Sequence, residues 1–148
     1  MSIASTLFTD SQARVYRWLF GQPERSFHWN EMRRLTGLGS ASLQRELNRL
    51  AEGGVVQTHR VGNLRCFQAN AQSAVYPELV SLTRKTLGAA PMVRQALGAL
   101  GADLQAAWLF GSVAKQTDTA QSDIDVMLVG ENLSLGRVLE LLAPLEPQ

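Results

Sequence analysis

The chain has 148 residues, of which 45% are hydrophobic and 18% charged, so it has room for one ordinary domain or two small ones. Its single cysteine, Cys66, excludes an intramolecular disulfide and a cluster of cysteine metal ligands, as is typical of proteins from a reducing compartment. The first residues lack the basic region of a signal peptide, and no apolar run approaches the roughly 18 residues that span a bilayer. We therefore expect a cytoplasmic protein with no membrane partner.

The net charge of +1 hides an asymmetry between the two halves of the chain. Residues 1–70 contain nine Lys or Arg and five Asp or Glu, whereas residues 71–148 contain five and eight. A basic half joined to an acidic half suggests two different tasks, although a small sample also produces such a difference by chance.

The basic half begins with two patterns of helical spacing. Apolar residues recur at this spacing from Asp10, which is expected to cap a first helix that ends at Gly21. The stretch SFHW then reads as a short strand. Asn30 is expected to cap a second helix, which ends at Gly37.

A third helix and a hairpin follow. The stretch SASLQRELNRLAEGG, from Ser40, predicts a helix with three leucines along one face. Its two final glycines end the helix. VVQTHR and LRCFQAN alternate apolar and polar residues like two strands, and residues 61–63 join them in a tight turn.

This order of elements resembles the winged helix-turn-helix of small bacterial transcriptional regulators of the ArsR-like kind. The resemblance covers about residues 10–70 and rests on GLGSASLQRELNRLAEGGVVQTHRVGNLRCFQAN. It implies that the partner of this region is double-stranded DNA.

The third helix and the hairpin carry side chains that suit such a role. A helix that begins with small hydroxyls can approach the major groove closely, which favours Gln44 and Arg45 at base edges, while other basic and amide groups hold phosphates. The expected DNA contacts are Ser40, Ser42, Gln44, Arg45, Arg49, Arg60, Asn63 and Arg65. The alternatives are a solvated surface or a winged helix that docks protein. His28 and His59 have no cysteine or carboxylate partner at metal spacing and are interpreted as ordinary polar residues.

Residues 73–90 are expected to form a helical connector between two domains. Pro77 occupies a first-turn position, where its missing N–H costs nothing. An apolar stripe that includes Leu79, Leu82 and Leu87 is interpreted as a homodimer contact, because winged-helix regulators often read two half-sites as a two-fold dimer. Packing of this helix on its own domain is the alternative.

The acidic half contains the stretch LFGSVAKQTDTAQSDIDVMLVG, residues 109–130. Its first residues end a short strand of buried type, and the glycine-serine pair that follows allows a phosphate to approach free backbone amides. In the strand around SDIDVMLV, Asp123 and Asp125 point the same way, about 6.5–7 Å apart at the backbone. Two carboxylates this close repel each other unless a divalent cation joins them, and hard oxygen ligands suit Mg²⁺, which also bridges phosphates.

This pattern resembles the nucleotidyltransferase superfamily that includes DNA polymerase beta, and it is most similar to the minimal bacterial members. The resemblance covers roughly residues 89–148 and implies Mg²⁺ and a bound nucleoside triphosphate, expected to be ATP. It assigns Asp123 and Asp125 as catalytic metal ligands and Gly111, Ser112 and Lys115 as nucleotide-binding residues.

Two departures from the family pattern leave catalysis open. Lys115 stands where active members often carry arginine, so the positive charge is kept and the bidentate fork is lost. Active members also use a third carboxylate on a later strand. The remaining acids, Glu131, Glu140 and Glu146, do not lie on a recognisable third strand, so the domain is either truncated or reduced.

The predicted fold class is therefore α+β. A winged helix-turn-helix at 1–72 and the connector at 73–90 precede a small α/β nucleotidyltransferase-like domain with a short mixed sheet at 91–148. The first functional hypothesis is a DNA-binding transcriptional regulator whose second domain binds nucleotide and Mg²⁺. The second is an enzyme that transfers AMP to a protein or small-molecule hydroxyl, as antitoxins of this superfamily do, with a cognate toxin as partner. The third is a non-catalytic protein-docking scaffold.

Overall fold

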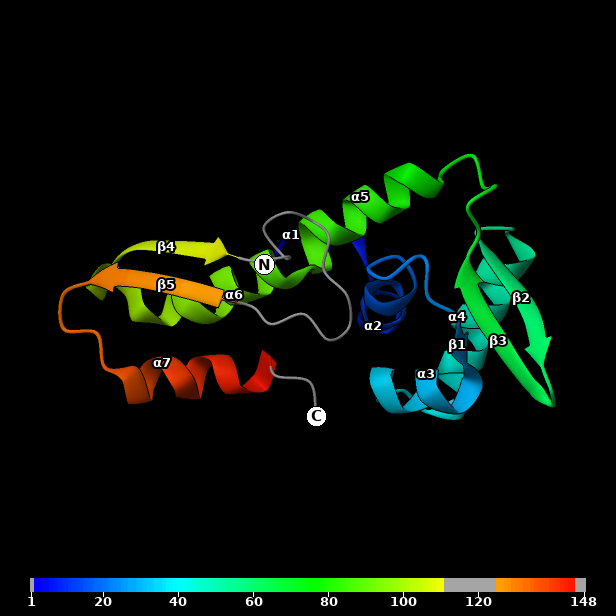
Figure 1. The fold of residues 1–148 in the computed structure, drawn as a ribbon, viewed down its shortest axis with the longest axis horizontal. Coiled ribbons are helices and arrows are strands. Elements are labelled where there is room, and N and C mark those ends of the chain that lie inside the picture. Colours follow the sequence, from blue (N-terminus) through cyan, green and yellow to red (C-terminus); the bar gives the residue numbers. More distant parts are fainter. Residues whose placement is uncertain (1, 111–124, 146–148) are drawn as a thin grey trace. The chain divides into compact units, whose positions relative to one another are not determined.

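The computed structural model describes residues 2–110 and 125–145 of the chain. These residues combine helices with two small antiparallel sheets, which confirms the α+β class. They divide into two compact parts, unit 1 (Met1–Gly88) and unit 2 (Ala89–Gln148) (Figure 1). No helix in the described ranges is both long enough and apolar enough to cross a bilayer.

Unit 1 begins with the helices α1 (Ile3–Leu7) and α2 (Asp10–Leu19). The cap of α2 is Thr9, and the prediction of Asp10 was wrong by one residue. The Thr9 hydroxyl accepts a hydrogen bond from the amide of Gln12, and the Gln12 side chain accepts one from the amide of Thr9. This reciprocal arrangement satisfies two amides that the first turn of a helix otherwise leaves free.

Helices α3 (Trp29–Thr36) and α4 (Ser40–Glu52) are joined by a short turn. α3 is capped by Nδ1 of His28, which accepts a hydrogen bond from a first-turn amide, and not by Asn30 as predicted. Gly37 ends α3 with a φ of 63°, a left-handed conformation that glycine adopts at little cost. The turn between α3 and α4 therefore begins with a glycine at a position that requires a positive φ.

The sheet of unit 1 contains β1 (Phe27–His28), β2 (Val56–Val61) and β3 (Leu64–Ala69). Their order is β1-β3-β2, and both pairs are antiparallel. β2 and β3 form the predicted hairpin, whose turn begins at Gly62 with a φ of 60°.

The core of unit 1 forms where α2, α3, α4 and the sheet meet. Its largest fully buried side chains include Phe20, Phe27, Phe67, Leu19 and Met32. Helix α5 (Tyr76–Leu87) contacts α1 and α2, buries Leu87 in this core and packs Leu79 against it. The helix expected to be a connector thus belongs to unit 1, as in the alternative of packing on its own domain.

Unit 2 is smaller. Its elements are α6 (Ala89–Leu97), the 3-10 helix η1 (Gly98–Asp103), β4 (Leu104–Phe110), β5 (Asp125–Gly130), α7 (Leu135–Leu142) and the 3-10 turn η2 (Ala143–Leu145). β4 and β5 are antiparallel, so the mixed sheet predicted here is not found among the described residues. Gly130 stands where a Cβ atom would lie 1.9 Å from the carbonyl oxygen of Asp103, so this approach of η1 requires glycine.

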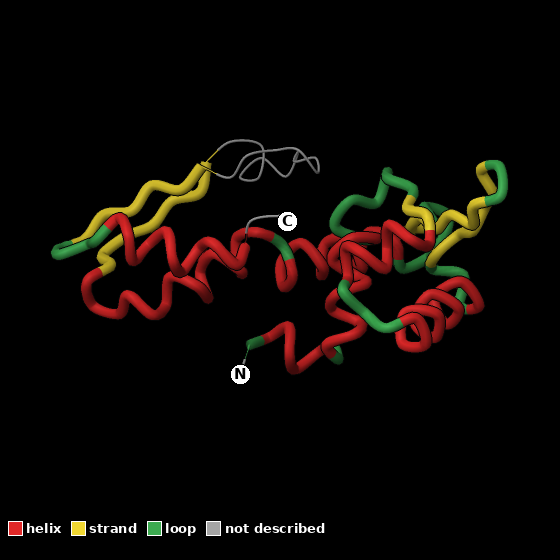
Figure 2. The backbone as a smooth tube through the Cα atoms, turned by 90° about the horizontal axis from the view of Figure 1, so that it is seen from below, coloured by secondary structure: helices red, strands yellow, loops and turns green. Residues whose placement is uncertain are grey.

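The helices of unit 2 lie on one side of its sheet (Figure 2). Among the described residues of this unit, the buried ones are Val93, Leu97, Leu100 and Val138, and strand residues Leu109, Val126 and Leu128 pack against them. Successive strand residues point to opposite faces, so the residues between these inward ones lie on the other face of the sheet. We call this the outer face, and it carries Trp108, Phe110, Asp125, Met127 and Val129.

Candidate functional site

The polar face of α4 is the first candidate site. Leu47 is fully buried on the inner side of the helix, whereas Ser40 and Arg45 are exposed and Gln44 is half-buried. Nε2 of Gln44 donates a 2.7 Å hydrogen bond to Oδ1 of Asn48, which holds the Gln44 amide along the helix. A ligand that reads the Gln44 amide would therefore have to replace this bond.

The first turn of α4 has no side-chain cap, because its N-cap position is Gly39. Ser42 is half-buried there, and its Oγ lies 3.5 Å from Nη2 of Arg45. A hydrogen bond at this distance is weak and leaves the guanidinium of Arg45 free to take a better partner.

Arg49 has a structural partner that the sequence pattern did not predict. Its Nη2 lies 2.7 Å from Oε2 of Glu46, which is only 9% exposed, and 3.4 Å from the hydroxyl of Tyr16. The hydrogen bonds that Arg49 donates to Glu46 and, with a smaller effect, to Tyr16 raise the pKa of Arg49 above its usual value. The contact with Tyr16 joins α4 to α2. A phosphate would compete with Glu46 for this guanidinium.

The end of the β2–β3 hairpin holds the other predicted DNA contacts. Arg60 and Arg65 are exposed and stand directly opposite each other in the register, and Asn63 is exposed in the turn between the strands. The guanidinium carbon of Arg65 lies 5.0 Å from the ring centre of Phe67, a cation–π contact that orients the side chain. Like charges directly opposite each other destabilise a hairpin, and a bound anion would remove this cost.

A basic depression beside the α3–α4 turn was not predicted. It has a volume of about 540 Å³ and is lined by Asn30, Arg33, Arg34, Gly37, Leu38 and Gly39. Arg33 and Arg34 are both exposed. Two adjacent arginines just before the glycine of the turn are the sequence signal that could have indicated this feature.

The register of the sheet brings His28, Cys66 and His59 side by side on three neighbouring strands. The sequence spacing did not reveal that the cysteine lies between the two histidines. Nδ1 of His28 already caps α3, and Nε2 of His59 lies 3.2 Å from Oγ of Ser26. Over the described ranges, no group of three His, Cys, Asp or Glu side chains is arranged to hold a metal ion.

Asp125 is the described member of the predicted metal and nucleotide site. It begins β5, is exposed, and stands opposite Phe110 in the register of the sheet. Its carboxylate belongs to the outer face, because the next residue, Val126, packs toward the helices. The other predicted members, Gly111, Ser112, Lys115 and Asp123, lie outside the described residues.

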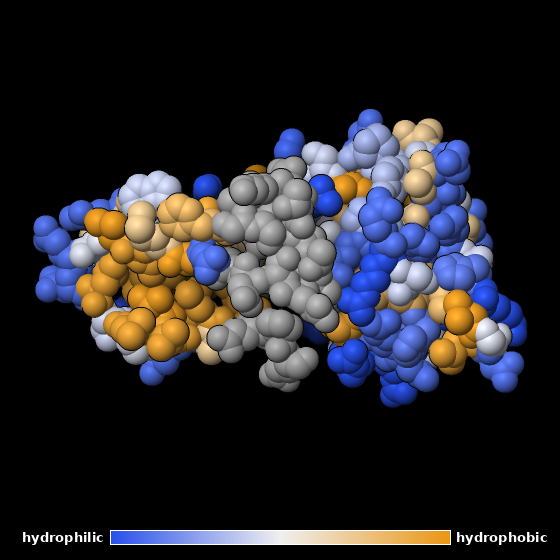
Figure 3. Space-filling view, viewed as in Figure 1, coloured by the Kyte–Doolittle hydropathy of each residue, from blue (hydrophilic) through white to orange (hydrophobic). Residues whose placement is uncertain are grey.

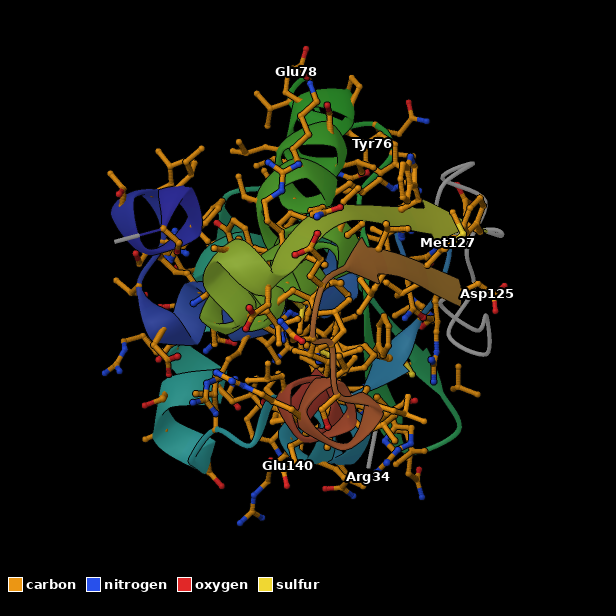
Figure 4. All side chains as sticks on the ribbon, turned by 90° about the vertical axis from the view of Figure 1, so that its left-hand side faces the viewer. Arg34, Tyr76, Glu78, Asp125, Met127 and Glu140 are labelled. Atoms are coloured by element: carbon orange, nitrogen blue, oxygen red, sulfur yellow. The ribbon has the colours of Figure 1, made fainter. Side chains whose placement is uncertain are left out.

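The remaining acids do not join Asp125 in the described part of unit 2. Glu131 follows the far end of β5, where its Oε1 lies 3.5 Å from Nε2 of Gln105. Glu140 lies on α7, at a separate place from Asp125 (Figure 4). Glu146 is outside the described residues. Among the described residues, neither Glu131 nor Glu140 therefore completes a carboxylate cluster with Asp125.

Comparison with known protein families gives one result. Residues 100–148 match the family model of "Polymerase beta, Nucleotidyltransferase", and this range includes β4, β5 and α7. This part of the chain is similar to the polymerase beta nucleotidyltransferases. No curated protein and no solved structure matches the chain. The match supports a nucleotidyltransferase-like domain in unit 2, and this family generally uses a nucleoside triphosphate and Mg²⁺.

Proposed function

We propose that the chain is a DNA-binding transcriptional regulator whose second unit binds a nucleoside triphosphate, ATP, together with Mg²⁺. In this proposal unit 1 is a winged helix-turn-helix. The order α2, β1, α3, α4, β2, β3 supports it, because it places two helices around a tight turn and follows them with a hairpin. α4 is the recognition helix and the β2–β3 hairpin is the wing.

The observation that carries the DNA-binding proposal is the opposed pair Arg60 and Arg65 at the end of the hairpin. The hairpin follows α4 directly and β2 contacts α4, so the exposed Arg45 belongs to the same compact unit. Phosphates offset the repulsion between such arginines, and each phosphate that a protein neutralises makes binding more sensitive to salt. Ser40, Ser42, Gln44 and Asn63 complete the proposed interface, with Arg49 in a secondary role because Glu46 holds it.

The test is binding of a fluorescent duplex by the whole chain over a range of salt concentrations. Arg60→Ala removes a proposed phosphate contact, so we expect weaker binding and a salt slope reduced by about one unit. Arg45→Ala is expected to weaken binding as well. The matched control is Arg94→Ala, which removes an exposed arginine of α6 outside unit 1. No binding of the native chain at low salt, or an equal effect of the control, would contradict the proposal.

For unit 2, the donor chemistry of Asp125 fits a hard divalent cation, since its carboxylate is exposed on the outer face. Asp123, two residues earlier, is the proposed second ligand, and Gly111, Ser112 and Lys115 are the proposed phosphate contacts. The bound cation would neutralise the charge of the phosphate chain. Asp125 itself places a carboxylate at the start of β5, opposite Phe110 in the register of the sheet.

A second candidate function is transfer of AMP to a hydroxyl of a protein, such as a cognate toxin, or of a small molecule. The match of residues 100–148 to the nucleotidyltransferase family favours it. Transfer would form a bond from the acceptor oxygen to the α-phosphorus, break the bond to pyrophosphate and release the hydroxyl proton. The test is Mg²⁺-dependent labelling by ATP that carries radioactive α-phosphate. Asp125→Asn is expected to abolish labelling and Glu140→Gln to preserve it. Labelling that survives Asp125→Asn would contradict this role.

The proposed assembly is a homodimer, because two-fold proteins read two half-sites of an operator. Sedimentation should then give twice the mass of one chain, and a monomer at the concentrations that bind DNA would exclude the homodimer.

A docking scaffold is the remaining alternative. It predicts neither DNA binding nor nucleotide binding, and a protein partner whose affinity is unchanged by Arg45→Ala and Asp125→Asn.

A further inference from the structure

The outer face of β4 and β5 carries four large apolar side chains at the surface. Trp108, Phe110, Met127 and Val129 are 46%, 45%, 46% and 45% exposed, and we call these four residues the outer strip. Trp108 stands opposite Met127 in the register. The two strands therefore contribute to one surface, and their alternate residues pack toward α6 and α7.

Unit 2 also exposes hydrophobic side chains away from the outer strip. Hydrophobic side chains gather over the region of β5 and α7 in the space-filling view (Figure 3). Leu135 and Leu139 of α7 are among them, at 73% and 55% exposure. Soluble proteins rarely leave a large contiguous apolar patch without a ligand or partner for it.

The outer strip, unlike the exposed apolar residues of α7, has a carboxylate at one end. Asp125 lies on the same strand as Met127 (Figure 4) and stands opposite Phe110. Trp108 is two residues before Phe110 on β4, so its side chain lies roughly 7 Å farther along the same face. One surface thus offers an acidic end for a metal-bound phosphate and an aromatic end for a planar group.

We propose that the outer strip is the base-binding part of the nucleotide site, with the base stacked on Trp108 and flanked by Met127. This inference rests on the proposed binding of a nucleoside triphosphate at Asp125. The ribose would bridge the separation between the two ends. Stacking on an aromatic ring is tolerant of base identity, because every base has a π face. The site should therefore bind ATP and GTP with similar affinity.

The experiment compares ATP with inorganic tripolyphosphate, which lacks a base, by titration calorimetry of the whole chain in Mg²⁺. Trp108→Ala is expected to weaken ATP binding about tenfold or more and to leave tripolyphosphate binding unchanged. Trp108→Phe keeps an aromatic face and should restore most of the ATP affinity. Asp125→Asn should weaken the binding of both ligands. Leu135→Ala is the matched control, since it removes an exposed apolar side chain of α7.

A second readout is fluorescence. Trp18 and Trp29 lie in unit 1, so ATP should quench the Trp108 part of the emission, and this quenching should vanish in Trp108→Phe. If the native chain binds neither ligand, the proposed nucleotide function fails and this inference fails with it. If both ligands bind and Trp108→Ala weakens neither or both equally, only the base site is overturned. A Trp108→Ala variant that changes the oligomeric state with unchanged ATP affinity would instead assign the outer strip to contact between copies.

Discussion

The two units differ in how they use their apolar residues. Unit 1 encloses three phenylalanines completely within a core that draws on helices and sheet. The described residues of unit 2 bury their core less completely, at 2–8% exposure, and four of their exposed large apolar side chains share one face of a single sheet. The exposed ones of unit 1 are instead divided among α1, the β2–β3 hairpin and Val75. A two-stranded sheet is marginal without further packing. Unit 1 therefore covers its large core side chains with its own helices and sheet, whereas unit 2 presents an apolar surface that a ligand or partner can cover.

The largest expected effect comes from the core of unit 1. Phe67→Ala should lower the free energy of unfolding by about 3–5 kcal/mol, because it opens a cavity beside Phe27 in a fully enclosed site. Urea denaturation followed by circular dichroism measures this. Phe67→Leu keeps most of the volume and should cost less than half as much. A Phe67→Ala loss below about 1 kcal/mol would remove the contrast between the units.

The equivalent truncation in unit 2 should have a smaller effect. Leu97→Ala is expected to cost about 2 kcal/mol, the lower end for such changes, because the surrounding core lies close to the solvent and can relax. Trp108 reports on this unit, so its emission, isolated by comparison with Trp108→Phe, gives the transition. A loss as large as that of Phe67→Ala would show that the core of unit 2 is equally tight.

The ion pair of Glu46 and Arg49, within α4, should contribute less than either core. Glu46→Gln keeps a hydrogen-bond acceptor for Arg49 and removes the charge, so it should cost about 1 kcal/mol. Glu52→Gln, on the exposed side of the same helix, is the control and should change stability by less than about 0.5 kcal/mol. The same Glu46 variant weakens the attraction between residue 46 and Arg49. Stronger duplex binding would therefore support a phosphate role for that arginine, and unchanged binding would argue against it.

The smallest effect on stability should come from the exposed face of α7. Leu135→Ser is expected to change the free energy of unfolding by no more than about 0.5 kcal/mol, since Leu135 is 73% exposed. Its solubility should rise, because the apolar patch of unit 2 becomes smaller. A loss above about 1 kcal/mol would mean that Leu135 is packed in the protein as it exists in solution.

Local patterns predicted the elements better than their ends. Helical periodicity found α2 and α4, and the alternation on either side of Gly62 found the β2–β3 hairpin. The caps were missed at Asp10 and Asn30, because several polar residues near a helix start can accept the first amides. The backbone path selects among them, and it favoured Thr9 and His28.

In the candidate sites, too, features set by neighbouring residues were predicted and contacts between distant elements were not. The sequence predicted Arg60 and Arg65 near the hairpin turn, because two residues on either side of a tight turn face each other. It did not predict the ion pair of Arg49 with Glu46, since the position of α2 decides which side of α4 is buried. Nor did it decide between a dimer contact and the core of unit 1 for Leu87, which the structure buries in that core.

By itself, then, the sequence determined the α+β class, the order of helices and hairpin in unit 1, and Asp125 at the start of an apolar strand, because caps, turns and periodicity act over a few residues. Only the tertiary structure decided which residues are neighbours across strands. It aligned Cys66 with His28 and His59, and it joined Trp108 and Met127 to the face that carries Asp125. Strand register depends on contacts between distant segments, and a shift of one residue would send every one of these side chains to the opposite face.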